Sequence, residues 1–253
     1  MLLQRWSISS KLIAAMPDSE RALFFLLGHA INEINVFNKL FYLSNQYDQS
    51  KKWEQHAHVT QGMALARALV GKLLEAWNLL GTAYFASKLS LTYGSKLDAN
   101  AQSALKELGR YFGRENLINK VRNSFAFHYE VKDVRAVLSS ELNADELVSY
   151  MGETNANTVH YFSEYAINYA MLGSISADPA DAMSRLMAES QKVVGWFNDA
   201  AQAIMFTLAE TYLLAEDGTI STNEVEIGQV PVAEDLEIPF FIESRLAKRV
   251  PSA

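Results

Sequence analysis

The sequence predicts an all-α protein: an elaborated up-and-down helical bundle with an extended acidic C-terminal arm. Hydrophobic residues make up 49% of the 253 residues, which suffices for a packed core. No proline lies between Asp18 and Asp178. Since proline costs about 3 kcal/mol inside a helix, long helices are permitted throughout that region. Apolar residues there recur at helical spacing, which favours helices over strands.

Two long helices are predicted in the first part of the chain. The first should run from about residue 19 to 46, because one apolar stripe follows its length. The stripe consists of Leu23, Leu27, Ile31, Ile34 and Phe41. The second should run from about 53 to 91 and is apolar on nearly every face over 63–80. That pattern is typical of a central helix contacted from several sides.

Capping residues and a glycine set the bounds of the next two helices. Asp98 or Asn100 can cap a third helix, which Gly113 then breaks. A fourth helix is expected over 114–129. Its apolar side consists of Leu117, Ile118, Val121 and Phe125.

In the second half of the chain the apolar residues are less regularly spaced. Residues 131–152 favour shorter helical pieces. Residues 157–174 suit either a helix or a strand, because aromatic and β-branched side chains are frequent there. Asp178 followed by Pro179 is typical of a helix start, and this last helix can extend to about Leu214.

The character of the sequence changes at Glu216. Counted from Glu216 itself, eight acidic residues occur before any basic one, which predicts an extended, solvated arm or a short hairpin. We therefore divide the chain into a helical bundle, 1–215, and an arm with a short basic tail, 216–253. Without the eight acids and three bases of the arm, the bundle holds 21 acidic and 19 basic residues and is compatible with an anionic ligand. The arm itself could be an acidic surface segment, or an inhibitory or partner-docking segment.

Several classes of protein are excluded by composition. The absence of cysteine removes disulfides, thiolate metal sites and cysteine nucleophiles. The longest apolar run, 22–27, is far shorter than the roughly 20 residues of a membrane-spanning helix, and the amino terminus lacks the pattern of a signal peptide. We therefore expect a cytoplasmic protein with no membrane partner.

Motifs for cofactors and metals are also missing. The sequence contains neither of the glycine-rich phosphate-binding motifs, GxGxxG and GxxxxGK[ST]. It also contains no HExxH motif, and none of its histidines has a glutamate three positions before it, which argues against zinc proteases and four-helix di-iron proteins. His56 and His58 would point about 200° apart on a helix, so we interpret them as ordinary surface histidines and not as ligands of one ion. No metal and no cofactor are expected.

One group of residues could carry chemistry. Arg122 and His128 stand six positions apart in the predicted fourth helix. His128 falls about 120° from Arg122, inside the apolar stripe, while Arg122 lies at the margin of the stripe with Asn119 and Asn123 just beyond it. A partly desolvated histidine can act as a general base or acid, and a guanidinium can bind a phosphate with two hydrogen bonds.

The segment Arg122-Asn123 followed by His128 resembles the signature of the HEPN superfamily, in which an arginine, often followed by asparagine, precedes a histidine by a few residues. The resemblance implies a helical bundle and a metal-independent endoribonuclease of toxin–antitoxin or abortive-infection type. It implies that Arg122 and His128 are catalytic, with Asn123 as support. It also implies a site built from two subunits, hence a homodimer, and an antitoxin or regulatory partner. Tyr129 directly follows the histidine and is counted with the supporting residues.

Further polar residues are weaker candidates for a functional site. Asn38 lies in the middle of the first apolar stripe and could orient His128, line the cleft, or be satisfied within the core. Tyr111, Arg114 and Lys120 could extend a positive surface or belong to an ordinary solvated helix face. His160 and Glu164, four positions apart, could form an ion pair.

The leading hypothesis is therefore an RNA-cleaving enzyme. His128 would take the proton from an RNA 2′-hydroxyl or deliver one to the leaving oxygen, Arg122 would stabilise the pentacoordinate phosphate, and the product would carry a 2′,3′-cyclic phosphate. The alternative is a non-catalytic helical interaction protein that binds RNA, a nucleotide or a partner chain in the same groove. A helical bundle with a small-molecule pocket, or a core histidine beside a surface arginine, also fits the pattern.

Overall fold

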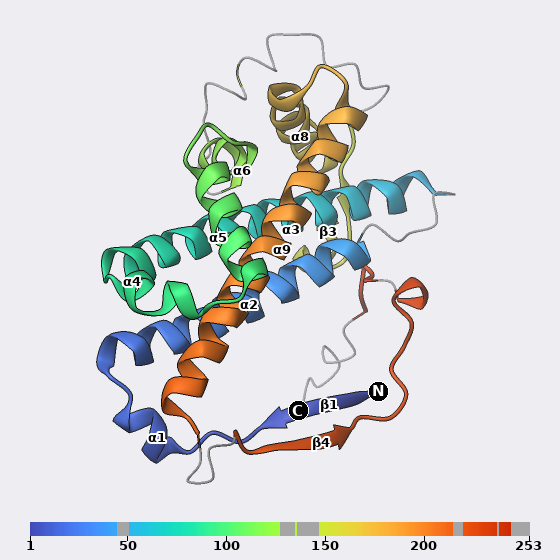
Figure 1. The fold of residues 1–253 in the computed structure, drawn as a ribbon. Helices are drawn as coiled ribbons and strands as arrows, with labels where there is room; N and C mark the ends of the chain where they lie inside the picture. Colours follow the sequence, from blue (N-terminus) through green and yellow to red (C-terminus); the bar gives the residue numbers. More distant parts are fainter. Residues whose placement is uncertain (45–50, 127–134, 136–146, 215–219, 237, 244–253) are drawn as a thin grey trace, which may run out of the picture.

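The computed structural model describes residues 1–44, 51–126, 135, 147–214, 220–236 and 238–243. The fold is mostly α, as predicted, with two short two-stranded antiparallel sheets beside the helices (Figure 1). Among the described residues, no helix combines the length and the apolar character that crossing a membrane requires.

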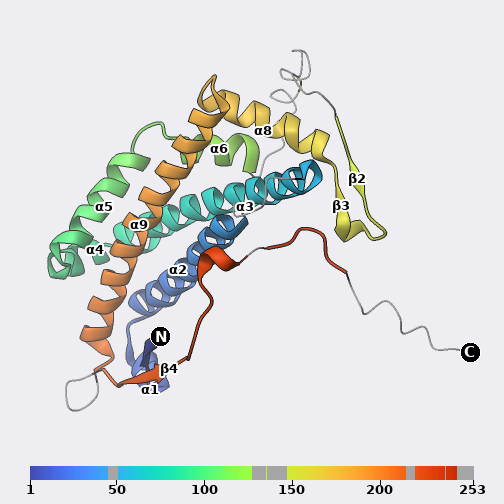
Figure 2. The ribbon, with the colours of Figure 1, turned by 90° about the vertical axis from the view of Figure 1, so that its right-hand side faces the viewer.

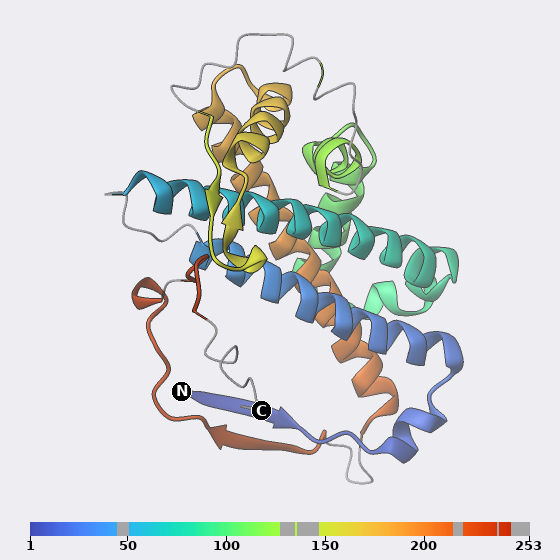
Figure 3. The same ribbon diagram turned by 180° about the vertical axis from the view of Figure 1, so that it is seen from behind.

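Two long helices, α2 (Asp18–Ser44) and α3 (Lys52–Leu79), run antiparallel through the centre (Figures 1 and 3). The helix α9 (Pro179–Tyr212) crosses this pair, and α5 (Ala99–Phe112) packs along α9. Figure 2 shows α5 and α9 on one side of the pair and two short strands on the other. The core therefore lies between two helical layers, with α3 contacted from several sides as its sequence predicts.

The predicted first helix is confirmed to Ser44, after which residues 45–50 lie outside the described part. The predicted second helix is too long. The helix α3 ends at Leu79 and continues as the π-helical segment η1 (Leu80–Ala86). Lys88 then takes a φ of 65°, a left-handed conformation that no α-helix contains, and only afterwards does α4 (Leu89–Tyr93) begin.

The third helix is confirmed with its cap. The carboxylate of Asp98 accepts a hydrogen bond from the backbone N–H of Ala101 (2.8 Å) at the start of α5, which follows the short 3₁₀ turn η2 (Gly94–Lys96). Gly113 stands directly after the last residue of α5.

The fourth helix begins later than predicted. Asn116 caps α6 (Leu117–Val121) by accepting from the N–H of Asn119 (2.9 Å), so the residues before it form a loop. From Arg122 the winding widens into the π-helical segment η3 (Arg122–Ala126).

Residues 157–174, whose sequence suits either a helix or a strand, contain both a strand and a helix. The strands β2 (Tyr150–Met151) and β3 (Thr158–Val159) pair antiparallel around the 3₁₀ turn η4 (Asn155–Asn157), and α8 (Tyr161–Ile175) follows. The expectation of helical pieces up to residue 152 is therefore wrong at β2. Most of 131–146 lies outside the described residues.

The last helix is confirmed. Asp178 accepts from the N–H of Ala180 (2.9 Å), Pro179 occupies the first position, and α9 runs unbroken to Tyr212.

The N-terminal segment forms structure that the sequence analysis did not predict. The strand β1 (Leu2–Trp6) precedes the short helix α1 (Ser10–Ala15) and pairs antiparallel with β4 (Thr222–Glu226). The described part of the acidic arm is thus extended, as predicted, and its strand β4 pairs with the N-terminal strand. Trp6 contacts Phe206 of α9 edge to face, with ring centroids 4.7 Å apart, which anchors this ribbon to the helices.

The arm returns to the helical body beyond β4. After the 3₁₀ turn η5 (Ala233–Asp235), the backbone carbonyl of Ile238 accepts from the side chain of Gln61 on α3 (3.2 Å). The side chain of Asn157 bonds to both the N–H (2.9 Å) and the carbonyl (2.7 Å) of Ile242. Beyond β4, the described part of the arm is therefore held to α3 and to the β2–β3 turn.

Candidate functional site

Arg122 lies at the first position of η3 and faces α3. Its Nη2 donates to Oε1 of Glu75 (3.2 Å), and its Nη1 donates to the side-chain oxygen of Asn123 (3.2 Å). The apolar stripe beside it is buried as predicted, and the Arg122 side chain keeps 27% of its surface exposed. A guanidinium at the margin of a buried stripe, within reach of solvent, is what the helical spacing predicts.

His128 and Tyr129 lie outside the described residues. Their relation to Arg122 therefore remains a prediction from the sequence. The start of the motif, in η3, packs against α3.

The supporting asparagines occupy different places. Asn123 is exposed and accepts from Arg122. Asn119 is half-buried on α6, and its side-chain oxygen has no hydrogen-bond partner among the described residues. Asn38 accepts from the side chain of Gln191 on α9 (2.6 Å), so its amide oxygen is satisfied between α2 and α9. The hydrogen bond of Asn38 therefore lies at the interface between the two helical layers.

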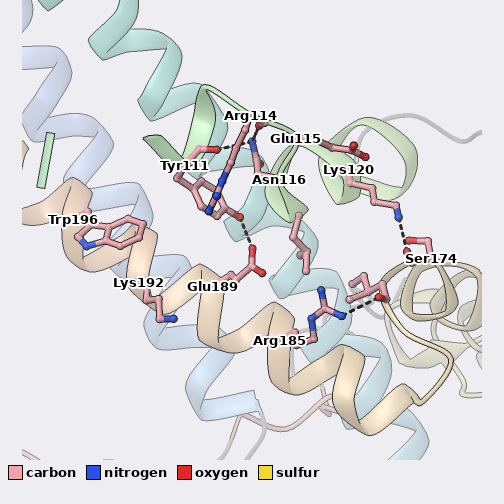
Figure 4. Close-up of a pocket in the computed structure, with 12 residues that line it drawn as sticks. Tyr111, Arg114, Glu115, Asn116, Lys120, Ser174, Arg185, Glu189, Lys192 and Trp196 are labelled. Carbon is pink, nitrogen blue, oxygen red and sulfur yellow. Dashed lines mark hydrogen bonds between the residues drawn. The ribbon is translucent and has the colours of Figure 1, made fainter. Parts of the chain in front are cut away.

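A second group of polar and charged side chains surrounds a cleft of about 490 Å³ between α5, α6, α8 and α9 (Figure 4). Four of its residues are basic and two are acidic, so the lining carries a formal charge of +2. The lining residues are Tyr111, Arg114, Glu115, Asn116, Leu117, Lys120, Ser174, Ile175, Arg185, Glu189, Lys192 and Trp196. We call this the basic cleft.

The structure brings together the residues for which a positive surface was predicted, since Tyr111, Arg114 and Lys120 all line the basic cleft. The opposite wall of the cleft was not predicted from the sequence. Arg185, Glu189, Lys192 and Trp196 recur on α9 every three or four residues and thus share one helix face. That spacing is the signal that could have identified the wall.

Tyr111 forms a fixed part of the basic cleft. Its hydroxyl donates to Oε2 of Glu189 (2.8 Å) and accepts from the N–H of Ile118 (3.4 Å). Burial, together with the hydrogen bond to Glu189, raises the pKa of the Tyr111 hydroxyl above its usual value. Tyr111 therefore stays neutral and joins α5 to both α6 and α9.

The four cations of the basic cleft divide into two kinds. The ammonium of Lys120 donates to the carbonyl of Ser174, and Nη1 of Arg185 donates to the carbonyl of Ile175 (3.2 Å). These carbonyls belong to the last turn of α8, where unsatisfied acceptors and the helix dipole favour positive charge. Arg114 and Lys192, in contrast, are exposed, and their side chains have no hydrogen bond or ion pair with any residue that the structure describes.

The basic cleft and Arg122 lie on different sides of the α6–η3 segment. Lys120 and Arg122 are two positions apart, so their side chains leave the helix in nearly opposite directions. Lys120 reaches α8, whereas Arg122 reaches Glu75 on α3. The structure does not bring Arg122 into the basic cleft.

The histidines of α3 are not surface residues, which corrects the earlier interpretation. His56 and His58 are each 8% exposed. The ring of His56 stacks on Tyr161 with centroids 3.7 Å apart, and its Nδ1 lies 3.0 Å from the hydroxyl of Tyr150. The β2–β3 hairpin passes over this part of α3 and covers it (Figure 3).

The side chains of His160 and Glu164, for which an ion pair was predicted, each contact a different residue. Nη2 of Arg67 donates to Oε2 of Glu164 (2.9 Å), and Nδ1 of His160 lies 3.1 Å from the hydroxyl of Ser149. Within the described ranges, no group of three or more histidine, aspartate or glutamate side chains could hold a metal ion.

Comparisons of the chain with protein-family models, with curated proteins and with solved structures give no match. The resemblance to the HEPN superfamily therefore rests on the motif that begins at Arg122 and on the helical fold.

Proposed function

We propose that the protein is a metal-independent endoribonuclease in which Arg122 and His128 act on one RNA phosphodiester. The observation that supports this is the position of Arg122, which stands solvent-accessible beside a buried stripe, on the π-helical segment that leads toward His128. Single π-helical turns within α-helices occur frequently at functional sites.

In the proposed reaction the 2′-oxygen of the RNA attacks the adjacent phosphorus. His128 either accepts the 2′-hydroxyl proton or protonates the departing 5′-oxygen, solvent water takes the other of these two proton transfers, and Arg122 stabilises the charge of the pentacoordinate phosphate. The bond between phosphorus and the 5′-oxygen breaks. The products are a 2′,3′-cyclic phosphate and a 5′-hydroxyl, and no metal is required in this scheme.

The ion pair between Arg122 and Glu75 is compatible with this role. The two side chains are 27% and 56% exposed, and ion pairs of this kind stabilise a protein by about 0–1 kcal/mol. A substrate phosphate can therefore replace Glu75 at little cost. The proposal includes a homodimer that assembles two motifs, a cytoplasmic location and control by an antitoxin or other regulatory chain.

The test is RNA cleavage in excess chelator. We expect fragments that end in a 2′,3′-cyclic phosphate, and we expect Arg122→Ala and His128→Ala to lose cleavage. Arg110→Ala is the matched control, because Arg110 is an exposed arginine of α5 that pairs with Glu107 (2.6 Å). Cleavage that persists in both the Arg122 and the His128 variant contradicts the assignment.

A second candidate function is binding without turnover. The basic cleft supports it, because that cleft offers cations to an anionic ligand away from Arg122. RNA binding by a wild-type protein that releases no fragments would favour this alternative.

A further inference from the structure

We infer that the basic cleft is a binding site for a nucleoside phosphate, separate from Arg122. The inference does not rest on the proposed nuclease activity, since neither Arg122 nor His128 is among the cleft residues. Three properties of the cleft carry it: its two available cations, its aromatic side chains and its size.

The available cations are Arg114 and Lys192. The other two, Lys120 and Arg185, already serve a structural purpose at the end of α8, which accounts for their presence. No comparable role explains Arg114 and Lys192 within the part of the chain that the structure describes. Figure 4 shows Arg114 on the α5–α6 side of the cleft and Lys192 on the α9 side. An arginine with a lysine across a concave surface suits a phosphate, to which the guanidinium can donate two hydrogen bonds.

The charge of the surroundings strengthens this preference for an anion. The whole chain carries a formal net charge of −7, yet the cleft carries +2. Because its walls are protein, the field of the four cations is concentrated within the cleft. Lys120 and Arg185 contribute to that field although their hydrogen bonds go to backbone carbonyls.

The aromatic side chains favour a ligand that also has a planar ring. Trp196 is half-buried at one end of the cleft, and its ring centroid lies 6.3 Å from that of Tyr111. The exposed part of an indole is a stacking surface for a nucleobase. Glu189 uses Oε2 for Tyr111, and the described residues leave Oε1 without a donor, so this oxygen can accept a ribose hydroxyl.

The size of the cleft fits one nucleotide. Its volume of about 490 Å³ is within the range of pockets that enclose small ligands. The nucleotide could be free or part of an RNA strand, since both present the same phosphate, ribose and base.

The experiment is calorimetric titration of the full-length protein in chelator with four probes: AMP, adenosine, inorganic phosphate and hexa-adenylate. Hexa-adenylate is titrated into Arg122→Ala, so that binding is measured without cleavage. We expect one AMP per chain and weaker binding of adenosine. A hexa-adenylate affinity at least about tenfold above that of AMP identifies an RNA strand as the source, and a similar affinity identifies a free nucleotide.

Two variants test the assigned residues. Arg114→Ala/Lys192→Ala should weaken AMP binding by about tenfold or more. Trp196→Leu should weaken AMP binding and leave phosphate binding unchanged. The matched control is Lys106→Ala/Arg110→Ala, which removes two exposed cations of α5 outside the cleft. Circular dichroism establishes that each variant is folded.

The inference is overturned if AMP does not bind, if adenosine binds as tightly as AMP, or if the Arg114/Lys192 double variant binds AMP like the wild type. AMP binding that is equal in wild type and Arg122→Ala supports it, whether or not RNA is cleaved. Failure of the nuclease proposal and failure of this inference are therefore distinguishable.

Discussion

Replacing Tyr84 by phenylalanine should stabilise the protein. Tyr84 lies on η1, its side chain is 0% exposed, and its hydroxyl has no hydrogen-bond partner among the described residues. A buried polar group without a partner costs about 1–3 kcal/mol. The substitution removes that group and leaves the ring in place.

The gain is reduced by the void that the hydroxyl leaves. An oxygen-sized void of roughly 10–15 Å³ costs about 0.3 kcal/mol. The net effect should be a rise of about 1 kcal/mol in the free energy of unfolding. For a chain of this length, that corresponds to about 2 °C in Tm. Urea unfolding and thermal melting followed by circular dichroism measure both quantities.

The matched control is Tyr93→Phe. The hydroxyl of Tyr93 lies 2.8 Å from the hydroxyl of Tyr212 and donates to the buried carboxylate of Glu20 (3.1 Å). The same substitution there should lower the free energy of unfolding by about 1–2 kcal/mol, because it leaves Glu20 short of a donor. A Tyr84→Phe variant that is less stable than wild type, or shifts in the same direction at both positions, refutes the reasoning.

Three further predictions concern pH, a cap and the Arg122 site. Burial raises the pKa of Tyr84 to about 12, so the folded protein resists ionisation of this tyrosine, and the free energy of unfolding of the wild type should fall by about 2–3 kcal/mol as the pH rises from 10 through 12. Phenylalanine does not titrate, so the advantage of Tyr84→Phe in urea titrations should widen over this pH range, and parallel curves would contradict this. Asp98→Ala should cost about 1 kcal/mol in urea unfolding by removing the cap of α5, with Asp98→Asn retaining most of it. Glu75→Gln should tighten RNA binding about two- to fivefold by removing the carboxylate that pairs with Arg122, and unchanged binding would show that the ion pair does not compete with phosphate.

The sequence predicted the elements whose signals are local. Asp98 and Asp178 each start a helix as caps, and the stripe from Leu23 to Phe41 is largely buried. Local signals did not predict the elements whose structure depends on a partner far away in the sequence. The strand β1 pairs with β4 more than 200 residues away, and its alternation is too short to recognise without that partner. The break after η1 depends on one left-handed residue, Lys88, which is neither glycine nor asparagine.

The same distinction applies to the candidate sites. The margin position of Arg122 followed from helical spacing, because spacing fixes which face a side chain occupies. The basic cleft could be anticipated only along α5 and α6. Its second wall depends on α9 packing beside α6, a tertiary contact that the periodicity of either helix leaves open. The burial of His56 was missed for the same reason, since the covering hairpin follows about 90 residues later.

Lys120 and Arg185 hold the final carbonyls of α8 from two different helices, and Tyr111 joins a third helix to the same wall. The cleft is thereby preorganised: its shape exists before a ligand arrives, so association need not include the conformational entropy of ordering a loop. Occupancy should then protect few additional backbone amides from hydrogen exchange, and the heat of binding should come chiefly from contacts with the ligand itself.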